Sequence, residues 1–167
     1  YDLVAGNLRT ISSGPGNHKH PSIDGTLVAW EDDRNGTTDI WGYDFANNTQ
    51  FPIYRSLDKE QDPLVQGHIV YFRTYRFNVW DIDSVDLDNN GTSSEITADS
   101  KIQTAPFSNG RDVYFLNQYI GLTWTLAKYD AHLGRVVETT IHLQDSAPTP
   151  LSEDRMIEIV PDVGYAQ

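Results

Sequence analysis

The chain has 167 residues, a formal net charge of −12 and no cysteine. One domain with a buried core fits this length. The acidic excess excludes a protein that binds nucleic acid through the phosphate backbone. The lack of cysteine excludes disulfides and thiolate metal sites. No segment approaches the roughly 18 consecutive apolar residues of a membrane-spanning helix, so no membrane insertion is expected.

The first predicted strands follow one another along the N-terminal part of the chain. "YDLVAGNLRTIS" from Tyr1 is typical of the end of one strand and the whole of the next. "HPSIDGTLVAW" from His20 predicts a short proline-containing strand, a turn and an apolar strand rich in β-branched and aromatic residues. An Asn-Gly turn in "RNGT", a strong hairpin signal, leads into the strand "IWGYDF". No stretch has a convincing helical period, so we predict an all-β chain.

This pattern recurs along the chain. Gapless matches to "HPSIDGTLVAW" begin at Asp62, Ala105 and Thr149, and the prolines of successive matches are 42, 43 and 44 residues apart. Each unit has room for four short strands joined by tight turns. Four antiparallel strands in about 43 residues, repeated, is typical of a β-propeller blade, because one such sheet buries its faces only against its neighbours.

The predicted fold is therefore a β-propeller of about four blades, each of four antiparallel strands, in a single domain over 1–167. The repeat units span approximately 20–61, 62–104 and 105–148. The last blade is expected to combine the C-terminal strands of 149–167 with the N-terminal strand of 1–19. Three interpretations stay open: this blade closes within one molecule, it forms between successive molecules and generates rings or fibres, or the chain is a piece of a longer propeller.

The first unit, "HPSIDGTLVAWEDDRNGTTDIWGYDF", resembles the TolB-like propeller repeat of archaeal and bacterial surface and secreted proteins. The second unit resembles it less closely, and the remaining units match mainly by spacing. The resemblance implies a propeller that is often non-catalytic and acts as an extracellular, cell-surface or periplasmic scaffold. Fold similarity alone does not carry function.

One acidic hairpin is a candidate calcium site. In "DIDSVDLDNNGTSSE", Asp86, Asp88 and Asn90 match the first ligand positions of an EF-hand-like loop, and Glu95 follows. The twelfth position is Thr97 instead of the expected glutamate, so a solvated Asn-Gly turn is the competing interpretation. An earlier hairpin, "EDDRNGTTD", also gathers carboxylates, but there we favour turn stabilisation and an ion pair of Arg34 with a neighbouring acid.

Other side chains carry weaker signals. His18 and His20 form an H-x-H pair that alternation would place on one side of a strand, without a third ligand fixed by the sequence.

We expect the four tryptophans to pack between blades, although aromatic side chains also form sugar platforms. Glycosylation is expected only in an exported protein, at the sequon residues Asn35, Asn47 and Asn90.

These features favour a non-enzymatic extracellular module that binds a protein partner through loops at one end of the propeller. One alternative is a surface-fibre subunit that self-associates through its terminal strands. The other is a propeller that binds or cleaves polysaccharide, for which the histidine pair is the main support. We predict no catalytic residue and no cofactor apart from the calcium considered above.

Overall fold

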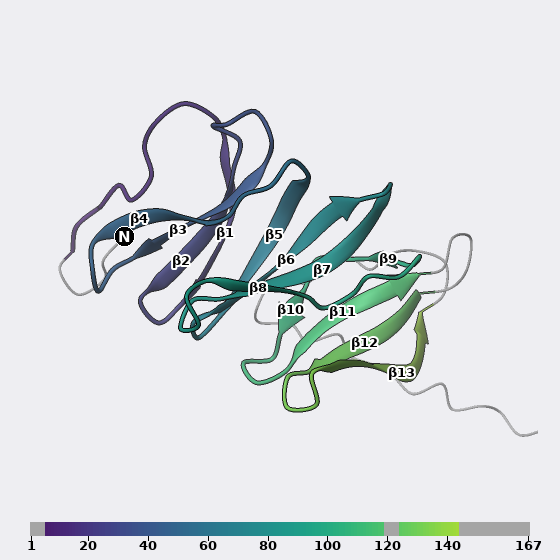
Figure 1. Cartoon of the computed structure of the whole chain (residues 1–167). Helices are drawn as coiled ribbons and strands as arrows, with labels where there is room; N and C mark the ends of the chain where they lie inside the picture. Colours follow the sequence, from purple (N-terminus) through teal and green to yellow (C-terminus); the bar gives the residue numbers. More distant parts are fainter. Residues whose placement is uncertain (1–5, 119–123, 144–167) are drawn as a thin grey trace, which may run out of the picture.

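The computed structural model describes residues 6–118 and 124–143, and every regular element in this part of the chain is a β-strand. The strands form three antiparallel sheets that follow one another in space in the order of the sequence (Figure 1). Among the described residues, none lies in a helix that could cross a membrane. The all-β prediction is confirmed for this part of the chain.

The first two sheets have four strands each, in sequential order, and the third has five. The strands of the first sheet are β1 (His18–Asp24), β2 (Leu27–Asp32), β3 (Asp39–Asp44) and β4 (Thr49–Tyr54). Those of the second are β5 (Lys59–Gln66), β6 (Ile69–Arg76), β7 (Val79–Asp86) and β8 (Thr92–Glu95). Those of the third are β9 (Ile102–Gln103), β10 (Phe107–Ser108), β11 (Val113–Gln118), β12 (Trp124–Asp130) and β13 (Arg135–Leu143).

The repeated prolines disturb the first strand of each sheet in the same place. The register shifts between Lys19 and Ser22 in β1, and between Gln61 and Leu64 in β5. In the third sheet the corresponding strand is divided into β9 and β10, both of which pair with β11. Proline has no N–H for the ladder, so a bulge or a break is the way in which a strand accommodates it.

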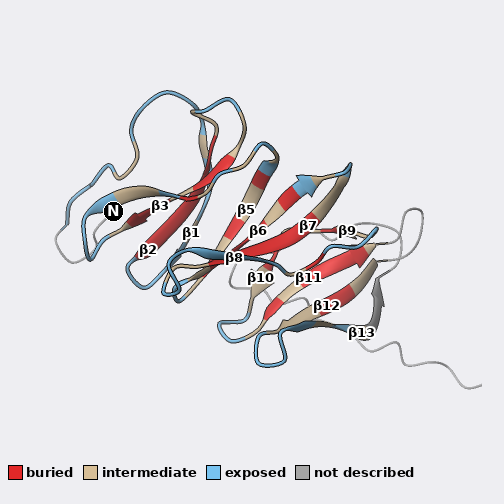
Figure 2. Cartoon of the chain, in the orientation of Figure 1, coloured by how far each residue is buried: buried red, intermediate tan, exposed pale blue. Residues whose placement is uncertain are grey.

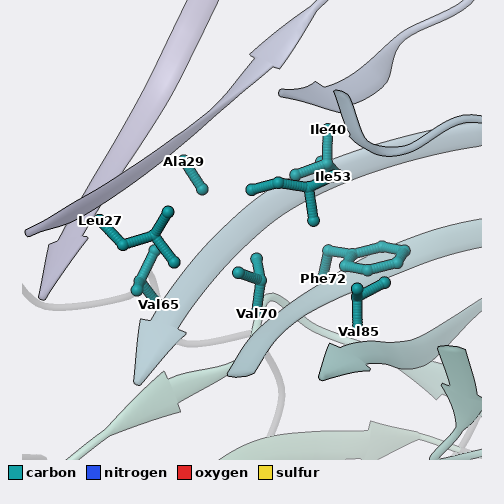
Figure 3. Close-up of a cluster of buried hydrophobic side chains, with 8 residues drawn as sticks. All are labelled: Leu27, Ala29, Ile40, Ile53, Val65, Val70, Phe72 and Val85. Carbon is teal, nitrogen blue, oxygen red and sulfur yellow. The ribbon is translucent and has the colours of Figure 1, made fainter. Parts of the chain in front are cut away.

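The main core lies between the first two sheets. Apolar side chains from both sheets form one buried cluster: Leu27, Ala29, Ile40 and Ile53 from the first sheet, and Val65, Val70, Phe72 and Val85 from the second. Figure 3 shows the two groups facing each other. Burial of this apolar area stabilises the pair of sheets in a way that neither sheet achieves alone.

A smaller cluster repeats this arrangement between the second and third sheets. Ile82 of β7 packs against Phe115 of β11 and Ala127 of β12, and all three are fully buried. Buried residues are concentrated on the two middle strands of each sheet (Figure 2). The second sheet is thus covered on both faces, as a blade within a propeller must be.

The first strands of neighbouring sheets also contact each other directly. The Ser22 hydroxyl accepts a hydrogen bond from the Val65 N–H at 3.0 Å, and the Asp24 carboxylate accepts one from the Gly67 N–H at 2.7 Å. The Gln66 side chain donates to the carbonyl of Arg111 beside the third sheet at 2.8 Å. We call β1, β5 and β10 the inner strands, because they converge on one side of the three sheets.

The other face of the first sheet is covered by the N-terminal segment. Ile11 packs against a buried cluster of Val28, Trp30 and Tyr43, and the Arg9 guanidinium lies 5.2 Å from the centre of the Tyr43 ring. Trp30 is therefore buried on the face of the first sheet that points away from the second, and its expected packing between two blades stays a prediction. The predicted last blade was expected to combine 1–19 with 149–167. In its N-terminal part, residues 8–17 form no strand, and 149–167 lie outside the described residues.

The inter-sheet core gives a direct prediction for stability. Phe72 is 0% exposed and fills the space between two sheets, so Phe72→Ala should lower the free energy of unfolding by about 3–5 kcal/mol. Phe77→Ala is the matched control, because Phe77 is 97% exposed, and it should change stability by less than about 0.5 kcal/mol. Urea unfolding followed by tryptophan fluorescence measures both, and equal losses would contradict this packing.

Candidate functional site at the bulges of the inner strands

Three side chains that can bind a cation meet where the two bulges lie side by side. Nδ1 of His20 is 2.6 Å from Oε1 of Glu31 and 3.4 Å from Oδ1 of Asp62. All three ligand atoms lie within 4.8 Å of one another. The Asp62 N–H donates to the same Glu31 oxygen at 2.8 Å and thereby joins the two sheets. Arg73 forms an ion pair with the other oxygen of Asp62, and we call these four residues the inner-strand cluster.

The repeat explains why these residues meet. His20 and Asp62 each precede a repeat proline, and Glu31 and Arg73 each follow that proline by ten residues. His20 and Asp62 both have left-handed backbone conformations, with φ of 48° and 53°. Non-glycine residues adopt this region rarely and at some energetic cost. Two equivalent bulges in neighbouring sheets therefore turn the two side chains toward one another.

The charges of the cluster depend on His20. Glu31 is only 3% exposed, and among the described residues no lysine or arginine forms an ion pair with it. The hydrogen bond with Glu31 raises the pKa of His20 above its ordinary value; burial opposes this shift, and the charges of Glu31 and Asp62 add to it. The cluster therefore stabilises a positive charge next to the buried carboxylate of Glu31. That charge can be a proton on His20 or another cation.

One aromatic side chain contacts the cluster and leads to an exposed apolar surface on the second sheet. The Arg73 guanidinium lies 4.5 Å from the ring centre of Trp80, and the Tyr75 and Trp80 rings are 5.0 Å apart. Leu57 and Phe77, in the two neighbouring loops, are 98% and 97% exposed. Lys59 pairs with Tyr75 across β5 and β6, so these two loops lie side by side. We call Leu57, Tyr75, Phe77 and Trp80 the loop face.

The predicted calcium ligands are not brought together. Asp86 accepts hydrogen bonds from the N–H groups of its own turn, and Asp88 contacts His68 at 2.6 Å. Glu95 pairs with Arg76 at 3.1 Å and lies opposite Asp83 in the sheet. That position is three residues from Asp86 along the strand, or about 10 Å. Asn90 lies exposed in the turn with φ of 55°. Calcium binding at this hairpin stays a prediction.

The earlier acidic hairpin divides its carboxylates between different partners. Asp32 accepts hydrogen bonds from Arg34 at 2.5 and 2.7 Å and from the Trp30 ring N–H at 3.0 Å. The expected ion pair of Arg34 is therefore present, but Asp32 and Asp39 are buried and not solvated. Burial alone would raise the pKa of Asp32, and the hydrogen bonds from Arg34 and Trp30 outweigh it and hold the pKa below its ordinary value.

The side chains of His18 and His20, the H-x-H pair, contact different groups of residues. The left-handed conformation of His20 turns its side chain to the inner-strand cluster, whereas Nδ1 of His18 contacts the Ser12 hydroxyl at 2.9 Å and lies 3.8 Å from Asp32. This row of serine, histidine and aspartate is not arranged as a catalytic triad. In a triad the two ring nitrogens face different partners, but here the same nitrogen faces both.

The three sequon asparagines all lie exposed in turns of the first two sheets. The side chains of Asn35 and Asn47 donate to Asp39 at 2.9 Å and to Asp44 at 2.5 Å, respectively. This placement is compatible with glycan attachment, which stays a prediction.

Comparison with solved structures identifies the fold. No family model and no curated protein matches the sequence. Among solved structures, TolB from Acinetobacter baumannii matches with a TM-score of 0.60 and 19% identity, over 82% of this chain and 36% of that chain. A putative TolB from Agrobacterium tumefaciens matches with a TM-score of 0.60 and 18% identity, over 77% and 50%. The tricorn protease matches with a TM-score of 0.59 and 17% identity, over 78% and 13%.

The chain has a TolB-like β-propeller fold. The resemblance seen in the first repeat is thereby confirmed at the level of structure, and the three described sheets correspond to blades. The chain spans half or less of the length of each of these proteins. Similarity at this level of identity concerns the fold.

Within this TolB-like fold, the sequence contained an unused signal for the site. The sequence interpretation considered His20 with His18 and Glu31 with its neighbours in the hairpin, and it did not consider Asp62 or Arg73. Superposing the repeats puts His20 on Asp62 and Glu31 on Arg73. Polar residues at two equivalent inner positions of successive blades are expected to be near neighbours, because the inner strands converge.

A buried carboxylate at the same end of the blades gives a pH prediction. The pKa of Glu60 is raised to about 7, mainly by burial; the hydrogen bond that Ser56 donates opposes the shift, and the charges of Asp39, Asp58 and Asp83 contribute to it. Because its folded pKa is raised, the contribution of Glu60 to folding stability should be full below about pH 4.5 and should be lost as the pH rises to 7.

The variant Glu60→Gln should remove this part of the pH dependence. Above pH 8 its free energy of unfolding should exceed that of the unmodified chain by roughly 2–3 kcal/mol, since each pKa unit corresponds to about 1.4 kcal/mol. Glu95→Gln is the control, because its carboxylate is largely exposed. Urea unfolding between pH 4 and pH 8.5 measures the effect, and parallel curves for the Glu60 variant and the unmodified chain would contradict it.

Proposed function

We propose that this chain is a non-enzymatic β-propeller interaction module that binds a protein partner through its loop face, outside the cell at the cell surface or in the periplasm. The TolB-like fold supports a scaffold role, because rigid blades hold neighbouring loops in fixed positions. The placement outside the cell rests on the sequence resemblance, and the exposed sequon asparagines are compatible with it.

The observation that carries this proposal is the exposure of Leu57 and Phe77 on adjacent loops. Phe77 has φ of 47° and is followed by Asn78 with φ of 68°, so the hairpin presents a bulky residue in a conformation that disfavours it. Strain of this kind tends to accompany function. Together with the exposed Tyr75 and the half-buried Trp80, these side chains form an apolar and aromatic surface. Such a surface suits an apolar segment of another protein.

The chemistry of the inner-strand cluster is compatible with a non-catalytic role. Its carboxylates are already engaged, Glu31 by His20 and Asp62 by Arg73. Neither these residues nor the row of Ser12, His18 and Asp32 combines a nucleophile with a correctly oriented base. Interaction by shape is therefore the simpler interpretation of this end of the propeller.

A peptide-display experiment tests the loop face. Immobilised chain should select peptides rich in aromatic and large apolar residues, and the double variant Leu57→Ser/Phe77→Ser should bind the selected peptides at least ten-fold more weakly. Leu133→Ser is the matched control, because Leu133 is 53% exposed in a turn at the opposite end of the sheets, and it should bind as the unmodified chain does. Equal binding by all three proteins would contradict the proposal, as would selective binding or turnover of acidic oligosaccharides.

The second candidate function concerns the face of the first sheet on which the N-terminal segment lies. We propose that residues 149–167 and 1–19 together supply a further blade there. Ile11 and Arg9 support this proposal, because they already lie on that face. If the blade closes within one molecule, the chain is a monomeric module; if it forms between molecules, the chain is a fibre subunit.

Light scattering coupled to size-exclusion chromatography distinguishes these two states. We expect a single species with the mass of one chain, 18.9 kDa, that does not change on dilution. A series of larger species that grows with concentration would contradict closure within one molecule and support exchange of terminal strands.

A further inference from the structure

We propose that His20, Glu31 and Asp62 form a binding site for a divalent transition-metal ion of the zinc class. This inference goes beyond the interaction function and does not depend on it. It differs from the calcium site expected from the sequence in both its residues and its ion.

The ligand atoms of His20 and Asp62 have the spacing that such an ion needs, and all three ligand atoms lie within 4.8 Å of one another. Two ligands of a tetrahedral zinc ion with bonds of about 2.0–2.2 Å lie about 3.4 Å apart. The distance from Nδ1 of His20 to Oδ1 of Asp62 is 3.4 Å. The 2.6 Å distance from His20 to Glu31 is that of a hydrogen bond, and it opens by less than 1 Å when a metal replaces the shared proton.

The neighbouring residues fix these ligands in place. Arg73 pairs with Oδ2 of Asp62, which leaves Oδ1 directed at His20. The Asp62 N–H holds Glu31 at 2.8 Å. Hydrogen bonds of this kind orient metal ligands and contribute to affinity. Since both bulges set the backbone of His20 and Asp62, little further ordering is required on binding.

The charge balance favours a cation. Glu31 is buried, and among the described residues no lysine or arginine forms an ion pair with it. A divalent ion held between His20, Glu31 and Asp62 supplies a positive charge beside this carboxylate. Metal ligands must be deprotonated to bind, so metal affinity should rise with pH.

The donor set selects the class of ion. One imidazole nitrogen and two carboxylate oxygens suit zinc and its first-row neighbours, whereas calcium takes six to eight oxygen ligands. His20 is 61% exposed, so solvent reaches the site and a water molecule can complete the coordination. Three protein ligands and one open position is the arrangement of an accessible zinc site and not of a closed structural one.

Calorimetric titration of the tag-free 167-residue chain with zinc chloride tests the proposal. We expect one zinc ion per chain, a rise in the melting temperature with zinc, and no comparable effect of calcium chloride. His20→Gln and Asp62→Asn should each weaken zinc binding at least ten-fold, and lowering the pH from 8 to 6 should weaken it in the unmodified chain. Far-UV circular dichroism checks that each variant is folded. If His20→Gln does not fold, the zinc affinity of Asp62→Asn, which preserves the shape of the side chain, tests the proposal.

His68→Gln is the matched control. Its imidazole is 60% exposed and lies 2.6 Å from the Asp88 carboxylate, much as His20 lies beside Glu31. Among the described residues, however, His68 belongs to no group of three metal ligands. Zinc binding should be unchanged in this variant. Absence of zinc binding in the unmodified chain, or an equal loss in the His20 and His68 variants, would overturn the proposal, and neither result bears on the loop face.

Discussion

A four-stranded sheet with apolar side chains on both faces cannot stay exposed in water, and the rest of this structure follows from that constraint. The first sheet buries Ile40 against Phe72 of the second, and the second buries Ile82 against Phe115 of the third. Each blade therefore depends on its neighbours for most of its stability. The outer face of the first sheet obeys the same constraint, since Ile11 covers Val28 there.

Face-to-face packing also determines where polar chemistry can occur. Sheets stacked in this way bring their inner strands together, and the repeat proline of each inner strand prevents regular pairing at one point. At that point His20 and Asp62 adopt left-handed conformations and direct their side chains to the boundary between blades. The inner-strand cluster is thus a consequence of the way in which a proline is accommodated in two neighbouring sheets.

The fold was more predictable from the sequence than the site. The spacing of Pro21 and Pro63, the β-branched strands and the Asn-Gly turn identified the first two blades, because these signals are local. The interruption of the third inner strand at Pro106 was not expected. Among the site residues, alternation along a regular strand predicted that His18 and His20 share a side. The bulge invalidates that expectation, because an extra residue reverses the direction of every later side chain.

The sequence by itself determined the repeat, the all-β class, the Asn-Gly hairpin turn and the resemblance to TolB-like propellers, since each of these depends on residues close together in the chain. Only the tertiary structure decided which carboxylates are buried and that Glu31 meets His20 and Asp62. The last contact joins residues from two sheets. Its geometry depends on the bulges and on the packing of one blade against another, and neither is encoded within a single segment.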